Sequence, residues 1–276
     1  MTVQEEIYPH IEPSTKYGRC YKMGPDGPWF GSVSTITHYG LPIDEHLMKY
    51  IIEQSGGDYM KSVSFHSEAA EIGTCVHKLA ERYLNGEVIE LPDNIDMSTL
   101  VPGRGYFPTY QTLEQIRKGF LSFIRFWEHN KPKLLFQEAL VWDMSKDAEG
   151  AYISPYCGRL DTVAEIDGET WLLDLKTSKT VKDKIDYGVQ LSMYKQLAEV
   201  RMNIKIDKLG IIHCNKMFKR AEPPKSVLEP IVYEYRPDLV HAAYTIFAAK
   251  FKGYEGIGNT PKIRPKTPTV FSLGGE

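Results

Sequence analysis

The sequence predicts a mixed α/β fold, in which a central mixed β-sheet is flanked by helices. The first observation is the order of the periodic segments, which runs from helices through three strand-like runs to a helix, a strand and a last helix. The second is the pair Asp167-Gly168 between two of the strand-like runs, a strong signal for a two-residue β-hairpin. Neither a helical bundle nor a sandwich is expected to show this order.

Helices are expected where apolar residues recur at helical spacing, and strands where apolar and β-branched runs lie between turn residues. Thr112-x-x-Gln115 has the form of a capping box and indicates the start of one helix. The expected helices begin near Ile43 and cover Ala69–Asn85, Thr112–Trp127, Tyr187–Val200 and Pro237–Phe251. The expected strands cover Leu134–Trp142, Cys157–Ile166, Glu169–Thr177 and Leu209–Cys214.

The chain is expected to hold one main domain at residues 32–256. Residues 1–31, rich in Pro, Gly and Tyr, indicate an irregular arm with one hairpin, and residues 257–276 a C-terminal tail. The four cysteines form no C-x-x-C pair, so their spacing indicates neither a zinc ribbon nor an iron-sulfur cluster. The sequence has no long apolar run, so neither secretion nor a membrane span is expected. A cytoplasmic location is expected instead.

Charge is distributed unevenly along the chain. The net charge is -3, yet residues 1–175 hold 15 Lys and Arg against 26 Asp and Glu, whereas residues 176–276 hold 18 against 10. Basic clusters of this kind are usually solvated surface. They would guide a polyanion if they flank a site that uses one.

The Asp167-Gly168 turn fixes the register of the hairpin. It places Ile166 opposite Glu169, and counting back along both strands places Asp161 directly opposite Asp174. Like charges across a ladder destabilise the pair, so something must offset them, and a divalent cation that prefers oxygen ligands does so well. The other face of the hairpin is expected to be apolar and to carry Leu160, Ala164, Ile166, Trp171, Leu173 and Leu175.

An alternative needs no metal. The same register places Arg159 opposite Lys176, and these two cations would neutralise Asp161 and Asp174 in an ordinary surface salt-bridge cluster. The hairpin geometry alone leaves both interpretations open.

Three short motifs, taken together, bear on this choice. Gly158-Arg159-Leu160-Asp161, then Asp174-Leu175-Lys176, then Gln190-x-x-x-Tyr194 resembles the core signature of PD-(D/E)xK nucleases of the RecB-like branch. Upstream, Gly73–His77 resembles the first motif of that branch, and Glu138 stands where the family often has a glutamate. The segment Ser32–Ile36 resembles the start of RecB-like exonucleases of the phage and mitochondrial genome maintenance type, and Leu160 replaces the proline of the motif.

The resemblance implies a restriction-endonuclease-like core and a metal-dependent DNA nuclease, with exonuclease action favoured. Phosphodiester hydrolysis would use a water activated by Mg²⁺ or Mn²⁺. The implied metal ligands are His77, Asp161, Asp174 and the carbonyl of Leu175, with Lys176 the catalytic cation beside the two aspartates. Gln190 and Tyr194 would touch DNA or brace the site, and Glu138 would support it. Without these motifs, His77 would be interpreted as a surface histidine paired with Glu81.

Two other functions stay open. One is a nucleic-acid-binding protein on the same fold without catalysis, and the other an endonuclease of the same superfamily. Nucleases of this branch that hold an iron-sulfur cluster are disfavoured, because no cysteine follows Cys214. DNA is the expected partner and a membrane is not, while polarity and oligomeric state are not indicated.

Overall fold

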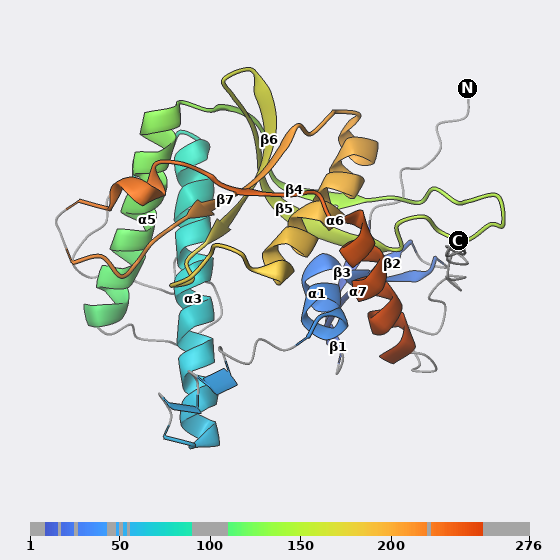
Figure 1. Cartoon of the computed structure of the whole chain (residues 1–276), viewed down its shortest axis with the longest axis horizontal. Helices are drawn as coiled ribbons and strands as arrows, with labels where there is room; N and C mark the ends of the chain where they lie inside the picture. Colours follow the sequence, from blue (N-terminus) through green and yellow to red (C-terminus); the bar gives the residue numbers. More distant parts are fainter. Residues whose placement is uncertain are drawn as a thin grey trace, which may run out of the picture.

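The computed structural model describes residues 9–15, 18–24, 27–42, 48–49, 52–53, 56–89, 110–219 and 222–250. Within them, eight strands form one mixed sheet flanked by helices, which confirms the predicted α/β fold (Figure 1). The strands are β1 (Pro9–Thr15), β2 (Gly18–Met23), β3 (Trp29–Ser32), β4 (Lys133–Trp142), β5 (Tyr156–Ile166), β6 (Glu169–Lys176), β7 (Lys208–His213) and β8 (Ile231–Tyr233). The helices are α1 (Val33–Gly40), α3 (Tyr59–Leu84), α5 (Tyr110–Asn130), α6 (Ile185–Met202), α7 (Pro237–Lys250) and a 3₁₀ turn at Lys225–Val227.

Strand β5 is the branch point of the sheet. One of its edges pairs antiparallel with β4, from Cys157 to Glu165. Its other edge serves two strands, since Tyr156 and Cys157 pair with β3, and the stretch from Thr162 to Ile166 pairs with β6. Between them, residues 158–161 make no ladder pair on this edge in the described structure. The candidate site lies at this gap.

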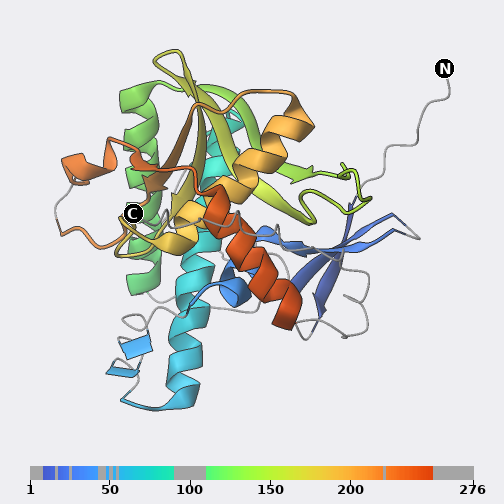
Figure 2. The same cartoon turned by 45° about the vertical axis from the view of Figure 1, so that its right-hand side comes forward.

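Helices cover both faces of the central strands, as Figures 1 and 2 show. On one face α3 and α5 lie side by side and pack through residues such as Val76 and Phe120 against Leu173 and Ile212. On the other face α6 packs through Leu197 and its neighbours, in one cluster with residues of α1 and α7. The central strands are therefore buried on both sides, which explains their nearly continuous apolar runs.

The first strands extend the sheet where the sequence indicated an irregular arm with one hairpin. β1 pairs with β2, β2 with β3, and β3 with β5. Tyr21, Met23 and Phe30 are buried there together with Trp142, so this part of the chain has an apolar core of its own. The domain division at residue 31 remains a proposal, and the helix expected near Ile43 and the tail at 257–276 lie outside the described residues.

Two local expectations meet different outcomes. Asp167 and Gly168 have φ of 52° and 80° and join β5 to β6 with Ile166 opposite Glu169, which confirms the turn and the register beside it. The capping box at Thr112 is wrong, because α5 already begins at Tyr110. The Thr112 hydroxyl instead donates to Glu68 on α3, at 2.7 Å, and so connects the two helices. Among the described helices none is long and apolar enough to cross a membrane.

Candidate active site

His77 comes from α3 and reaches the gap beside β5. Its Nε2 lies 3.0 Å from the carbonyl oxygen of Leu175, which can only accept a hydrogen bond. Its Nδ1 lies 3.5 Å from Oδ2 of Asp161, and the same Oδ2 accepts a hydrogen bond from the Leu175 amide at 2.7 Å. Asp161 thus takes the place of a ladder partner for β6. His77, Asp161 and the Leu175 carbonyl, which the resemblance implied as metal ligands, therefore lie close together.

Glu138 joins this group from β4. Its backbone has a φ of 48°, a left-handed conformation that is unusual for a non-glycine residue inside a strand and costs free energy. Ligand atoms of His77, Glu138 and Asp161 all lie within 4.8 Å of one another. The position that the sequence analysis assigned only a supporting role is therefore part of the most compact candidate ligand cluster among the described residues.

A second group lies on the α6 side of β6. Lys176 Nζ lies 2.5 Å from Oδ2 of Asp174, whose side chain is only 4% exposed. Gln190 bridges the two, since its amide donates to Asp174 Oδ1 at 2.9 Å and its Oε1 accepts from Lys176 at 3.1 Å. The lysine and the aspartate, two residues apart on one strand, are held as a pair by one residue of a helix.

Tyr187 is a member of the site that the sequence analysis missed. The ammonium of Lys176 lies 5.0 Å from the centre of the Tyr187 ring, within the range of a cation–π contact. The Tyr187 hydroxyl is 2.7 Å from the hydroxyl of Ser178. Position 187 is three residues before Gln190 on α6, so helical spacing from Gln190 was the available signal.

Tyr194 lies in the core and is 5% exposed. A Cβ at Gly158 would come within 2.8 Å of Tyr194 Cε1 and 3.2 Å of Val33, so the ring lies against the unpaired edge of β5. Of the two roles that the resemblance implied for this tyrosine, its burial favours bracing the strand over contact with DNA.

The hairpin register does not continue to the site as the sequence indicated. The last ladder pair of β5 with β6 is Thr162 with Leu173, one step before Asp161 and Asp174 would meet. Arg159 is exposed and pairs with Leu140 of β4, so it does not neutralise the aspartates from across the hairpin. Further along the same edge of β5, Tyr156 and Cys157 pair with β3.

The separation also changes which side chains share a face. Leu160 was expected on the same face as Ala164 and Leu173. In the structure Leu160 packs with residues of α6, whereas Ala164 and Leu173 pack against α3 and α5. The carboxylate face is not free of core either, because Val163 and Leu172 of that face are buried against α6. The expectation of a hairpin with one apolar face and one carboxylate face is therefore wrong, because both faces of the strand pair are buried.

The charges of the ligand cluster raise the proton affinity of two of its members. Burial lowers the pKa of His77, but the carboxylates of Asp161 and Asp174 outweigh burial and raise it to about 9. Burial and the neighbouring charge of Asp161 raise the pKa of Glu138 to about 7. Negative charge therefore makes His77 hold its proton more tightly, and burial together with the charge of Asp161 does so for Glu138, as is expected at an acidic site that suits a cation.

The second group is electrostatically coupled to the first. Burial and the charge of Asp161 raise the pKa of Asp174 to about 6, although Lys176 opposes them. Burial also acts to raise the pKa of Asp161, but His77 and Lys176 outweigh it and hold that pKa below the usual range. For Lys176 itself burial lowers the pKa, and the two aspartates more than compensate and raise it. Three carboxylates thus share two cations.

A divalent cation fits the residues present. Carboxylate and carbonyl oxygens with one imidazole suit Mg²⁺ or Mn²⁺. Gln137 lines the same small hollow as His77, Glu138 and Asp161, and its buried Oε1 has no hydrogen-bond partner in the described structure. An orphaned acceptor beside an acidic cluster is expected where an ion and its bound waters belong.

Comparison with known proteins agrees with this chemistry. The model of the PD-(D/E)XK nuclease superfamily matches residues 46–245, so the chain belongs to this superfamily. Its members are generally metal-dependent nucleases, which makes nucleic acid the implied class of substrate. Among the solved structures, the chain is similar to one titled "Crystal structure of SSO0001", with 13% identity and a TM-score of 0.31, over 74% of this chain and 86% of that chain. No curated protein matches.

Proposed function

We propose that this chain is a Mg²⁺- or Mn²⁺-dependent deoxyribonuclease that hydrolyses phosphodiester bonds at the gap between β5 and β6. The observation that carries the proposal is the convergence of two groups at this gap. His77, Glu138 and Asp161 have ligand atoms within 4.8 Å of one another, and the pair of Lys176 and Asp174 lies beside them. Membership of the superfamily supports hydrolysis of nucleic acid.

The proposed ligands are His77, Glu138, Asp161 and the carbonyl of Leu175, with Asp174 sharing its carboxylate between Lys176 and the ion. A bound ion would supply Lewis-acid chemistry, because it lowers the pKa of a water and neutralises charge on a phosphate. His77 must release its Nε2 proton, which in the structure joins it to Leu175. Its loss frees both the imidazole nitrogen and the carbonyl oxygen as ligands.

Lys176 acts as a fixed positive charge. Asp174 and Gln190 hold its ammonium from two sides, and the Tyr187 ring lies against it. A cation held in this way orients the attacking water and stabilises charge that develops on the phosphate, without reorganising during the reaction. Gln190 contributes by fixing both members of the pair, and Tyr194 by bracing β5.

Within this class we propose exonuclease action on DNA. The support is the segment Ser32–Ile36, which resembles the start of RecB-like exonucleases. In the structure Ser32 caps α1, where its Oγ accepts from the Thr35 amide at 3.1 Å, and Val33 packs beside Gly158 at the gap. The segment therefore lies next to the proposed site.

The proposal is tested by incubating linear DNA labelled at the 5′ end, linear DNA labelled at the 3′ end and circular DNA with Mg²⁺ or Mn²⁺. We expect the linear substrates to be degraded progressively from an end, the circular one to persist, and EDTA to stop the reaction. Linearisation of the circle would replace the exonuclease with an endonuclease of the same superfamily.

Asp174→Ala should abolish cleavage while DNA binding persists. Glu165→Ala is the matched control, because Glu165 is a carboxylate on β5 whose ion pair with Lys133 lies away from the gap. The control should cleave like the unmodified protein. Cleavage undiminished in Asp174→Ala, or undisturbed by EDTA, would contradict the mechanism.

A further inference from the structure

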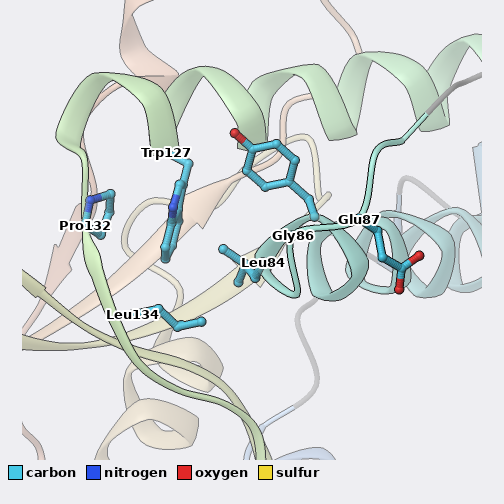
Figure 3. A pocket seen from close by; sticks show the side chains of 7 residues that line it. Leu84, Gly86, Glu87, Trp127, Pro132 and Leu134 are labelled. Carbon is cyan, nitrogen blue, oxygen red and sulfur yellow. The ribbon is translucent and has the colours of Figure 1, made fainter.

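A hollow lies further along α3 from the ligand cluster. Its volume is about 380 Å³, within the range of pockets that hold small molecules. We call it the Trp127 hollow. It is lined by Tyr83, Leu84, Gly86, Glu87, Trp127, Pro132 and Leu134. In Figure 3 the Trp127 ring extends from α5 into the space between Pro132 and Leu84.

The walls of the Trp127 hollow are aromatic and rigid. Trp127 stacks on Phe123, with ring centres 5.6 Å apart and planes inclined by 30°. Tyr83 meets Phe123 edge-on, with ring centres 6.1 Å apart. Phe123 is fully buried, whereas Trp127 and Tyr83 are partly exposed. The two accessible rings are therefore held in place from behind.

The lining excludes one kind of ligand. Glu87 is the one charged side chain among the lining residues, and its carboxylate pairs with Arg82 at 2.7 Å. Among the residues that the structure describes, no lysine or arginine lines the hollow, so this part of its wall is not built for a phosphate. An uncharged planar ring with polar edges suits aromatic walls of this kind.

The Trp127 hollow lies next to the smaller hollow of the ligand cluster. Leu84 lines both it and the smaller hollow that holds His77, Glu138 and Asp161. Leu84 follows His77 by seven positions on α3, which is about 10 Å at 1.5 Å per residue. Stacked nucleotides rise about 3.4 Å each, so the two hollows are within about three nucleotides of each other.

We propose that the Trp127 hollow binds one unpaired base of the substrate strand, about one to three nucleotides from the phosphate that is cleaved. Trp127 provides the stacking surface, and the base fixes which phosphate reaches the cluster. This inference rests on the proposed nuclease function and adds a positioning subsite to it.

Single-stranded DNA with one abasic residue tests the proposal, because the position of each cut defines the register of the strand. The rate is measured at every bond in the presence of Mg²⁺. We expect cleavage to slow about tenfold at bonds that lie at one fixed offset from the abasic residue, which is what the loss of one stacked base is worth. Trp127→Ala should slow cleavage at all bonds and should make the rate independent of the distance from the abasic residue. Trp127→Phe should still cleave more slowly at the fixed offset from the abasic residue.

Binding of the same DNA in EDTA gives a readout that needs no cleavage. Trp127→Ala should weaken affinity about tenfold. Phe136→Ala is the matched control, since Phe136 is an exposed aromatic on β4 outside the hollow, and it should change neither measurement. Thermal melting of each variant separates loss of folding from loss of binding.

The outcomes distinguish the two proposals. Metal-dependent cleavage that is equal at every offset, or Trp127→Ala that binds like the unmodified protein, overturns the subsite and leaves the nuclease function intact. Absence of metal-dependent cleavage overturns the nuclease function and the subsite with it.

Discussion

Substitution of Lys176 would disturb a buried charge pair. Its ammonium is the cation next to Asp174, whose side chain is almost fully buried. Removing it leaves a buried carboxylate with only the Gln190 amide as a donor. The consequences differ for catalysis, for metal binding and for stability, so one substitution separates the three.

We predict that Lys176→Met abolishes cleavage and leaves metal affinity within a few-fold of the unmodified protein, because Lys176 is not a proposed ligand. Isothermal titration with Mn²⁺ and a cleavage assay measure the two quantities. Loss of both together would mean that Lys176 organises the metal centre instead of acting on the substrate.

The same variant should show a pH-dependent loss of stability. Burial already raises the pKa of Asp174 to about 6, and Lys176 opposes that rise, so removing it raises the pKa further. A carboxyl group with a raised folded-state pKa costs nothing at a pH below its ordinary value, and its cost grows as pH rises toward the folded value. Urea unfolding in EDTA should therefore show a difference near zero at about pH 4 and about 1–3 kcal/mol at about pH 8. A difference that is larger at low pH would contradict this.

At the level of elements, the gap on the edge of β5 depends on a close contact. Gly158→Ala would place a Cβ 2.8 Å from Tyr194 Cε1, which is too close for a carbon contact, and 3.2 Å from Val33, which is tight. We predict a loss of about 1–3 kcal/mol of stability, together with reduced cleavage, because β5 also carries Asp161. Gly73→Ala is the control, since its Cβ would meet only the Thr177 hydroxyl at 3.4 Å in a helix that favours alanine. Equal stability of the two variants would show that Tyr194 does not brace the strand.

Elements with a clear period or turn could be predicted from the sequence. β5 and β6 end within a residue of their expected bounds, because the Asp167-Gly168 turn and two apolar runs are local signals. α1 was missed, and β5 was not expected to branch, since the partners of a strand edge depend on segments far apart in the sequence. The ladder between Asp161 and Asp174 failed for the same reason.

The candidate site shows the same limit. Motif spacing identified His77, Asp161, Asp174 and Lys176, and the structure brings them together. Motif spacing did not show that Glu138 lies with His77 and Asp161, because the orientation of Glu138 depends on a positive φ inside β4. Nor did it show which residues hold Lys176, since Tyr187 and Gln190 reach it only once α6 packs on the sheet.

At the level of the whole molecule, metal binding should be coupled to folding and to pH. The ligand cluster draws its residues from α3, β4 and β5, so an ion that binds only the folded chain stabilises all three, by about 2.7 kcal/mol at a hundred times its Kd. The pKa of Glu138 is about 7 and that of His77 about 9, so both must release protons to the solvent before they can bind the ion. We therefore predict that Mn²⁺ raises the melting temperature and that its affinity increases from about pH 6 to about pH 9. An affinity that is constant over this range would contradict the assignment of these two ligands.

Mn²⁺ titration of the unmodified protein, followed by calorimetry at about pH 8, is the most direct test of the metal centre. Glu138→Gln and Asp161→Asn are titrated beside it, with Glu165→Gln as the control on the same strand as Asp161. The expected result is a metal site with normal affinity in the control and at least tenfold weaker affinity in the other two. Unchanged affinity in both ligand variants would contradict a metal centre at the gap between β5 and β6.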